Sequence, residues 1–244
     1  MSTKLQKLSL KTGLVATLAI VGCFLANTAH SSEPVKRVNI FVHPYYESAK
    51  GAAIAPKIVN VSKDHNALLA STKLADILKA RDDIAKNNGL ITPITLAVLA
   101  IRLYDLGLRD DAVVWFYIAK DRYATLAAVA DMKASNLAPI ADSFSNFADL
   151  AGIVINGYAF CDLDRQRKQR EKAFKWVKDN PYQTLFLPQI PAVAGDRKQN
   201  LSSGLAAIEA KMTKEFAFLA DPKNIATIKQ AREKSEMKAK FCWK

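Results

Sequence analysis

Paired carboxylates and a cysteine are the residues of this sequence that could do acid–base or nucleophilic chemistry. Asp110-Asp111 opens an apolar, aromatic stretch, and Cys161 stands beside an aspartate. Adjacent residues on a helix point about 100° apart, so the paired carboxylates do not converge on one substrate atom. A cysteine nucleophile needs a histidine partner, and the spacing of His43 and His65 places neither beside Cys161. The sequence therefore favours a helix-start role for Asp110-Asp111 and predicts no catalytic residue.

Metal and cofactor signatures are also missing from the sequence. It contains no HExxH, GxSxG, Walker or GxGxxG pattern. Neither Cys161 nor Cys242 belongs to a CxxC pair or a metal-spaced cluster, so a zinc site is not expected. We predict no metal and no cofactor. The enzymatic alternative is a cell-envelope hydrolase whose site follows none of these motifs.

Residues 1–31 have the three-part pattern of a secretory signal. Basic residues without acids precede an apolar run from Gly13 to Ala26, and a small polar segment follows. The apolar run is shorter than the roughly 20 residues that a membrane-spanning helix needs. Cleavage after Ser31 is favoured, and the alternative is a lipoprotein signal in which Cys23 becomes the lipidated N-terminus. Both routes predict export to the periplasm, the second with a lipid anchor at the envelope.

Export gives the two remaining cysteines a role. An exported protein that keeps two cysteines most simply joins them, which predicts a disulfide between Cys161 and Cys242. Closing a loop of about 80 residues would stabilise the fold by roughly 4 to 5 kcal/mol in the chain-entropy model. The alternative is a pair of separate buried thiols.

The charge of the mature chain limits its partners. Residues 32–244 comprise 213 residues with 32 basic and 23 acidic side chains, a net charge of +9. That length suits one compact domain. A basic exported protein meets an acidic protein or an anionic membrane face rather than nucleic acid, and we expect a membrane only if Cys23 is lipidated.

One predicted helix concentrates the basic residues. They are Arg165, Arg167, Lys168, Arg170, Lys172, Lys175 and Lys178. Such a run is typical of a solvated helix face, and the alternative is a docking surface for an acidic partner. The docking alternative predicts partner contacts at Arg165, Arg167, Lys168 and Arg170.

The elements that must position these residues are mainly helical. Two short segments rich in β-branched residues, 35–42 and 57–62, predict a small N-terminal β-hairpin. Three- and four-residue apolar spacing from residue 64 onward predicts helices, which are separated by glycine, asparagine and proline signals. Their expected ranges are 64–88, 93–106, 111–134, 140–155, 158–180, 203–219 and 222–240. The fold class is therefore mainly α, as a single helical domain with short N-terminal strands.

The clearest element is a helical hairpin over residues 92–134. Thr92 is a good N-cap, Pro93 stands at the first helical position, and Gly107 is a typical left-handed C-cap. Asp110 is expected to cap the second helix. These signals predict two antiparallel helices joined by a tight turn.

Residues 92–125 of this hairpin resemble a tetratricopeptide repeat or its Sel1-like relative. The resemblance is carried by Leu96, Leu99, Ala100, Leu103, Leu106-Gly107, Asp110-Asp111-Ala112, Phe116 and Ala119. It implies a protein-binding scaffold whose first helix lines the binding face, which would place Ile94, Ala97, Ile101, Tyr104 and Asp105 toward a partner. Because a lone repeat cannot bury its apolar face, neighbouring helices must cover the other side.

Trp115 and Tyr117 raise a separate question. They lie about 100° to either side of Phe116 on a helix, so the three rings cannot share one face. At least one of them must meet a neighbouring helix or a partner. We therefore add Trp115 and Tyr117 to the candidate partner contacts.

A looser resemblance concerns function. An exported helical chain with "YDLGLRDDAVVWFY" and "INGYAFCD" is similar to periplasmic immunity proteins of Gram-negative toxin secretion systems. The resemblance implies a non-enzymatic protein that binds and neutralises a toxin. A lipoprotein with a role in envelope assembly is the alternative from a different class.

Overall fold

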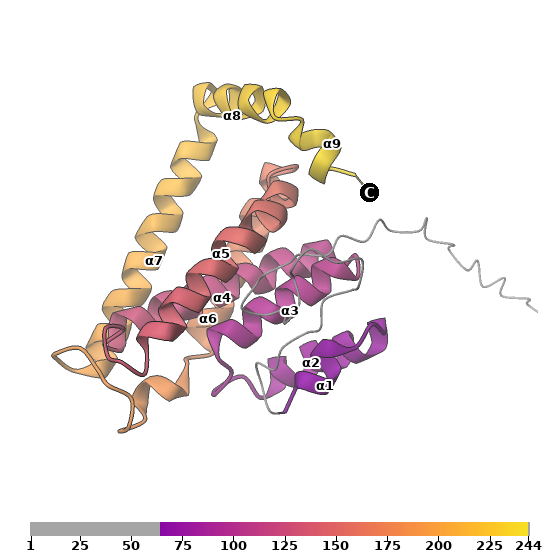
Figure 1. Ribbon diagram of the computed structural model, residues 1–244. Helices are drawn as coiled ribbons and strands as arrows, with labels where there is room; N and C mark the ends of the chain where they lie inside the picture. The colour runs from indigo at the N-terminus through magenta and orange to yellow at the C-terminus, as the bar shows by residue number, and fades with distance from the viewer. Residues whose placement is uncertain (1–63, 244) are drawn as a thin grey trace, which may run out of the picture. The chain divides into compact units, whose positions relative to one another are not determined.

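The computed structural model describes residues 64–243, and every regular element in that part of the chain is helical (Figure 1). The predicted signal sequence, Cys23 and the N-terminal β-hairpin lie outside the described residues. The elements are α1 (Asn66–Ala70), α2 (Leu74–Lys86), α3 (Pro93–Asp105), α4 (Arg109–Val129), α5 (Ala138–Ala159), α6 (Leu163–Asp179), the 3-10 helix η1 (Gln183–Phe186), α7 (Arg197–Ala220), α8 (Pro222–Lys234) and α9 (Met237–Phe241). The mainly α fold class is confirmed for the described chain. No helix within it is both long and apolar enough to cross a membrane.

The predicted hairpin forms from α3 and α4. The Thr92 side chain accepts a hydrogen bond from the backbone N–H of Thr95 at 3.1 Å, and Pro93 starts α3. Gly107 has the left-handed φ of 85° that ends the helix and allows the chain to reverse. Asp110, however, does not cap α4, because the N-cap position is Leu108 and has no capping side chain. That expectation was wrong, and the Asp110 carboxylate has other partners.

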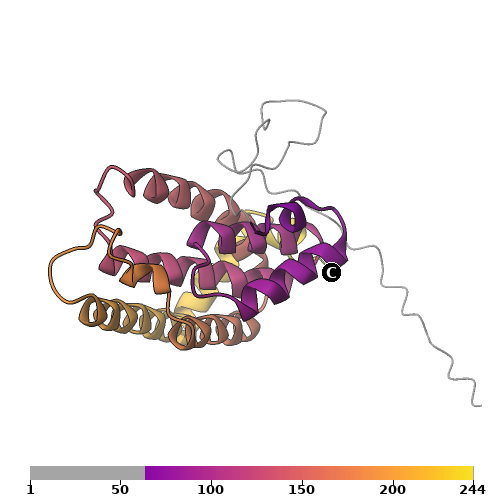
Figure 2. The same cartoon turned by 90° about the horizontal axis from the view of Figure 1, so that it is seen from below.

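Helix α4 is the centre of the core. It packs against α3, α5, α6 and α7, and in Figure 2 it lies between α5 on one side and α6 with α7 on the other. A helix with several neighbours buries side chains on more than one face, and α4 buries charged residues such as Asp121 and Arg122 beside its apolar ones. This explains why Trp115, Phe116 and Tyr117 are all buried although they point in different directions.

Each of the three adjacent rings meets a different neighbour. Trp115 packs edge-on against Trp176 of α6, with 5.5 Å between the ring centroids. Phe116 faces α5 at Gly152, where an added Cβ would lie 3.4 Å from the phenyl ring. The Tyr117 hydroxyl accepts a hydrogen bond from Gln166 of α6 at 3.2 Å. The rings thus join α4 to the helices around it.

The boundary between α5 and α6 differs from the prediction. Asn156-Gly157 does not break α5, which continues to Ala159. Gly157 allows the Phe241 ring to pack directly against α5, since a Cβ at this position would lie 2.7 Å from that ring. Asp162 caps α6 by accepting the backbone N–H of Arg165 at 2.9 Å. Cys161 consequently lies in the turn between the two helices rather than inside a helix.

The chain ends in a segment that we call the C-terminal arm, residues 221–243. The expected single helix over 222–240 is divided into α8 and α9 at Glu236, whose φ is 54°. Neither α8 nor α9 contains a buried residue. Figure 1 shows α8 crossing from the end of α7 and α9 descending toward the end of α5. We call α1–α6 the body.

Candidate functional site

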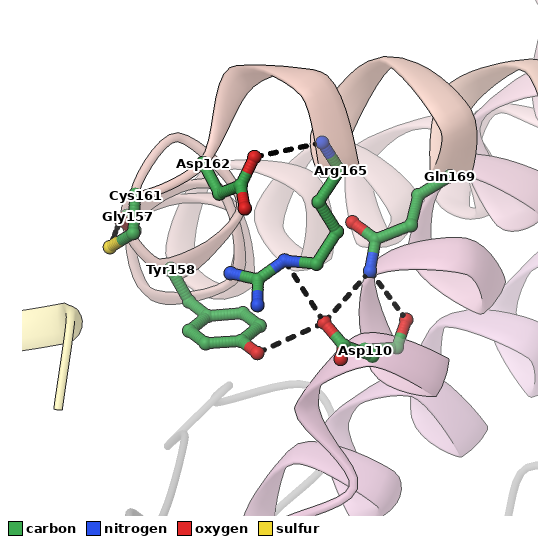
Figure 3. Close-up of polar contacts among 7 residues, drawn as sticks. All are labelled: Asp110, Gly157, Tyr158, Cys161, Asp162, Arg165 and Gln169. Atoms are coloured by element: carbon green, nitrogen blue, oxygen red, sulfur yellow. Dashed lines mark hydrogen bonds and ion pairs between the residues drawn. The ribbon is translucent and has the colours of Figure 1, made fainter. Parts of the chain in front are cut away.

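Polar side chains from three helices meet where α5 turns into α6 (Figure 3). The Oδ1 atom of Asp110, in the first turn of α4, accepts hydrogen bonds from the Tyr158 hydroxyl and from Gln169 Nε2, each at 2.9 Å. The Arg165 Nε atom lies 3.3 Å from the same oxygen. One carboxylate oxygen therefore joins α4 to both α5 and α6.

The Tyr158 phenol of this cluster is protonated at neutral pH. Burial, reinforced by the hydrogen bond to Asp110, raises the pKa of Tyr158 to about 12. The phenol is therefore a proton donor at neutral pH and does not serve as a general base. Because Oδ1 of Asp110 already faces three donors, the cluster acts as a polar connection between helices.

The predicted disulfide is confirmed next to this cluster. Cys161 and Cys242 are bonded across 81 residues of sequence, with their Cα atoms 5.5 Å apart. Arg232 of α8 donates a hydrogen bond through Nη2 to the Gly157 carbonyl at 2.9 Å, and the same atom lies 3.5 Å from each sulfur. The disulfide and Arg232 together attach the arm to the end of α5.

The end of the arm has a second attachment. The guanidinium of Arg109 lies 4.0 Å from the centroid of the Trp243 ring and 4.4 Å from that of Tyr158. A guanidinium between two aromatic faces forms cation–π contacts with both. Arg109 thus places the last described residue of the arm against the body.

A groove of about 700 Å³ lies between the start of α6 and the arm. Its lining contains both bonded cysteines and the guanidinium-bearing Arg232. The other apolar lining residues are Phe160, Leu163, Leu219, Ile225 and Ile228, and the other charged ones are Asp162, Asp164, Lys229, Glu233 and Lys238. The groove therefore combines an apolar lining with charged side chains of both signs.

A buried ion pair lies deeper, between α4 and α6. Arg170 donates two hydrogen bonds to Asp121, at 2.5 and 2.9 Å, and both side chains are less than 10% exposed. Burial raises the pKa of Asp121, and the adjacent Arg170 opposes that rise. The pair is desolvated and hydrogen-bonded on both sides, as a buried ion pair must be to persist.

Most of the residues expected to contact a partner are covered within the fold. Ile101, Tyr104, Asp105, Trp115, Tyr117 and Arg170 are each 7% exposed or less. They pack against neighbouring helices, so their assignment to an exposed partner surface is corrected. Arg165 is half-buried and lies against Asp110, while Arg167 and Lys168 are exposed on α6. Only these last two remain accessible as predicted.

Sequence reasoning did not find Tyr158, Gln169, Arg109 or Arg232. Their roles depend on contacts between helices far apart in the chain, such as the 75 residues between Arg232 and Gly157. No local spacing signals such contacts. Within residues 64–243, no cluster of histidine, cysteine and carboxylate side chains could hold a metal ion.

The fold and this junction define a helical domain whose C-terminal arm is fastened to its body by a disulfide. The chain belongs to the same family as an uncharacterized protein of Haemophilus influenzae, to which it is 33% identical over 231 residues. The matched region is 95% of this chain and 87% of the relative. No protein-family model matches the sequence, and no solved structure matches the chain.

Proposed function

We propose that the protein is an exported, non-enzymatic helical domain that binds an acidic protein partner, and that the partner is a toxin it neutralises. The observation that carries the proposal is a segregation of charge. Residues 162–243 contain 17 basic and 10 acidic side chains, whereas residues 64–161 contain 9 basic and 11 acidic ones. Because one half of the chain is positively charged and the other is not, the protein attracts an acidic partner and orients it toward the positive half.

The exposed face of α6 offers contacts of the required kind. Lys168 and Lys172 are exposed and stand one helical turn apart, so they share a face. Lys172 also borders a hollow of about 300 Å³ that Trp115 and Trp176 help to line. Trp115 is buried, so the accessible aromatic edge at this hollow belongs to the half-buried Trp176. Tryptophan is enriched at protein-binding surfaces.

The α3–α4 hairpin has a different task in this proposal. It resembles a tetratricopeptide repeat, but neighbouring helices cover the positions that such a repeat would offer to a partner, including Ile101 and Tyr104. We assign it the role of a central packing unit. Partner binding is assigned to α6 and the helices that follow it.

The test is affinity capture from periplasmic extract with a tagged, full-length chain. The Lys168→Glu/Lys172→Glu variant reverses two charges on the basic half, and Lys73→Glu/Lys133→Glu makes the same charge change on exposed residues of the other half. We expect one stoichiometric partner that the first variant retains about tenfold less and the control retains fully. Recovery of no stable partner, or equal losses for both variants, would contradict the proposal.

Neutralisation has its own readout. Once the captured partner is identified, its gene is expressed in the periplasm with and without this protein. We expect growth inhibition that the wild-type chain relieves and the Lys168→Glu/Lys172→Glu variant does not. A partner that leaves growth unchanged would remove the toxin part of the proposal and leave the binding part.

Export and its route are part of the same proposal. Cleavage after Ser31 places the mature chain free in the periplasm, whereas lipidation of Cys23 would anchor it to the envelope. A fatty-acid probe distinguishes the routes. We expect no label on the wild-type chain, and a label that Cys23→Ser abolishes would establish the lipoprotein route.

A further inference from the structure

We propose that the groove beneath the C-terminal arm is the docking site for an acidic, amphipathic segment of the protein partner, and that the Cys161–Cys242 disulfide builds this site. The inference rests on the proposed function and deepens it by naming the site and the chemistry of the bound segment. It joins three observations: an apolar groove, a positively charged arm and a covalent attachment that holds one wall of the groove in place.

The groove has the size and lining for a few large side chains. At about 700 Å³ it lies within the range of pockets that enclose ligands in proteins. Leu163 comes from α6, Leu219 from α7 and Ile228 from α8, so three helices contribute to its apolar surface. Each of these side chains is only half-buried in the chain alone. An amphipathic segment could cover them, which would gain the free energy of removing apolar surface from water.

The charge of the arm selects an acidic segment. Residues 221–243 carry six basic and three acidic side chains. Lys229 and Lys238 are exposed at the groove and form no ion pair with any residue of the described chain. The groove lining also contains three acidic side chains: Asp162, which serves as the N-cap of α6, and the exposed Asp164 and Glu233. The preference for an acidic segment therefore comes from the net positive charge of the whole arm. Carboxylates on a bound segment would pair with Lys229 and Lys238, which form no ion pair within residues 64–243, and the arm's excess of positive charge would attract the segment as a whole.

The disulfide is what keeps the wall of the groove in position. Neither α8 nor α9 buries a residue, so packing alone supplies little to fix them against the body. Cys242 bonds to Cys161 at the end of α5, and the groove is lined by both cysteines. When a dithiol reductant breaks this bond, the reductant is oxidised and two thiols form on the chain. The wall then loses its covalent attachment.

The first experiment uses the oxidised, full-length protein and two fluorescein-labelled peptides. One is an amphipathic helix of Leu, Ala and Glu, and the other has Lys in place of every Glu. Fluorescence anisotropy gives the affinity of each. We expect the Glu peptide to bind at least about tenfold more tightly than the Lys peptide. Equal affinities, or no binding of the Glu peptide, would overturn the inference.

Variants then locate the binding. Cys161→Ser/Cys242→Ser removes the attachment, and Ile228→Glu places a like charge for the peptide inside the groove. Ile153→Glu is the matched control, because Ile153 is 64% exposed on α5 and does not line the groove. We expect the first two variants to weaken Glu-peptide binding at least about tenfold and the control to leave it unchanged. Wild-type affinity in the cysteine variant would overturn the role of the disulfide.

Methyl-labelled NMR spectra of the wild-type protein locate the bound peptide without the use of a variant that could fail to fold. Addition of the Glu peptide should shift the Ile225 and Ile228 resonances and leave those of Ile77 and Ile84, which are fully buried in α2, in place. Shifts confined to residues outside the groove would contradict the inference. Partner capture that persists in the cysteine and Ile228→Glu variants would separate the two proposals: the proposed function would stand, and the groove would not be its site.

Discussion

The body and the C-terminal arm of this protein are both helical, yet they are held in place by different means. In α3, 12 of 13 residues are buried, whereas α8, which also has 13 residues, buries none. The body is a packed core in which even arginines are desolvated. The arm is held by one disulfide, one arginine that bonds a carbonyl, one stacked tryptophan and the Phe241 ring, which packs on Gly157.

This difference separates global from local stability. Unfolding of the body exposes the core and should be cooperative, while release of the arm exposes little apolar surface. A chain-entropy figure for the disulfide applies only if the arm unfolds together with the body. Tryptophan fluorescence can follow both events, because Trp115 and Trp176 lie together in the body and Trp243 ends the arm.

The largest expected effect concerns Arg122, which has no solvent exposure. Its guanidinium donates hydrogen bonds to the carbonyls of Asn88, Ile91 and Asn180, at 2.6, 3.1 and 2.8 Å. Arg122→Ala leaves the carbonyls of Ile91 and Asn180 without this donor and opens a cavity, while the Asn88 carbonyl keeps its bond from the Ile91 N–H. We therefore expect a loss of about 4 kcal/mol in the free energy of unfolding. Denaturant titration measures it. Arg167→Ala on the exposed face of α6 is the control and should cost less than about 1 kcal/mol.

The next effect concerns the buried pair of Asp121 and Arg170. Asp121→Ala leaves the Arg170 guanidinium in the core without its carboxylate, and we expect a loss of about 3 kcal/mol. Replacing both, as Asp121→Leu/Arg170→Met, removes the desolvation cost together with the pair and should restore most of the stability. A double variant as unstable as Asp121→Ala would show that the pair contributes more than it costs.

The parts of this fold that local chemistry dictates were predictable from sequence. Thr92, Pro93 and Gly107 mark the ends of α3 through cap and turn preferences that act within a few residues. The disulfide followed from the cysteine count in a chain expected to be exported. The resemblance to a tetratricopeptide repeat implied that Phe116 is a packing residue, and Phe116 is buried, but it did not reveal that Trp115 and Tyr117 are buried too.

The candidate site was less predictable because its contacts are long-range. Asp110 and Tyr158 are separated by 48 residues, and Gly157 meets Phe241 from the other end of the domain. Asn-Gly is a local stop signal, but packing of the Phe241 ring on Gly157 gives the glycine a role within the helix. Tertiary contacts outweighed the local preference at this position.

A smaller predicted effect is a dependence of stability on alkaline pH, which we expect for the body and not for the arm. Burial raises the pKa of Tyr117 to about 12, above the ordinary 10.0 of an exposed tyrosine. From pH 10 to 12 the folded body keeps a proton that the unfolded chain has lost, so stability falls as the pH rises through that window, by about 2 kcal/mol. Below pH 10 this group adds no pH dependence.

Replacing the hydroxyl tests that assignment. Tyr117→Phe should reduce the loss of stability between pH 10 and 12, leaving the part that Tyr158 contributes, because the pKa of Tyr158 is also raised to about 12. The variant should also be about 1 kcal/mol less stable at neutral pH, since Gln166 loses an acceptor. Brief exposures at each pH, followed by denaturant titration, give the slope. The arm contains no tyrosine, so hydrogen exchange of the arm should change equally in both proteins over this range. An unchanged slope in Tyr117→Phe would assign the alkaline transition to another group.

The smallest effect tests the contact between the two regions directly. An added Cβ at Gly157 would lie 2.7 Å from the Phe241 ring, which must shift, whereas at Gly152 it would lie 3.4 Å from the Phe116 ring. Both glycines are inside α5, so Gly→Ala adds the same helix propensity, about 1 kcal/mol, at either position.

Gly152→Ala should therefore leave the body as stable as before or slightly more stable. Gly157→Ala should leave the stability of the body unchanged or slightly higher, but it should displace the arm. Trypsin should then cleave the chain faster after Lys238 and Lys240 than it cleaves the wild-type protein. Equal cleavage rates in the two variants would mean that Phe241 does not help to position the arm and that the disulfide and Arg232 suffice.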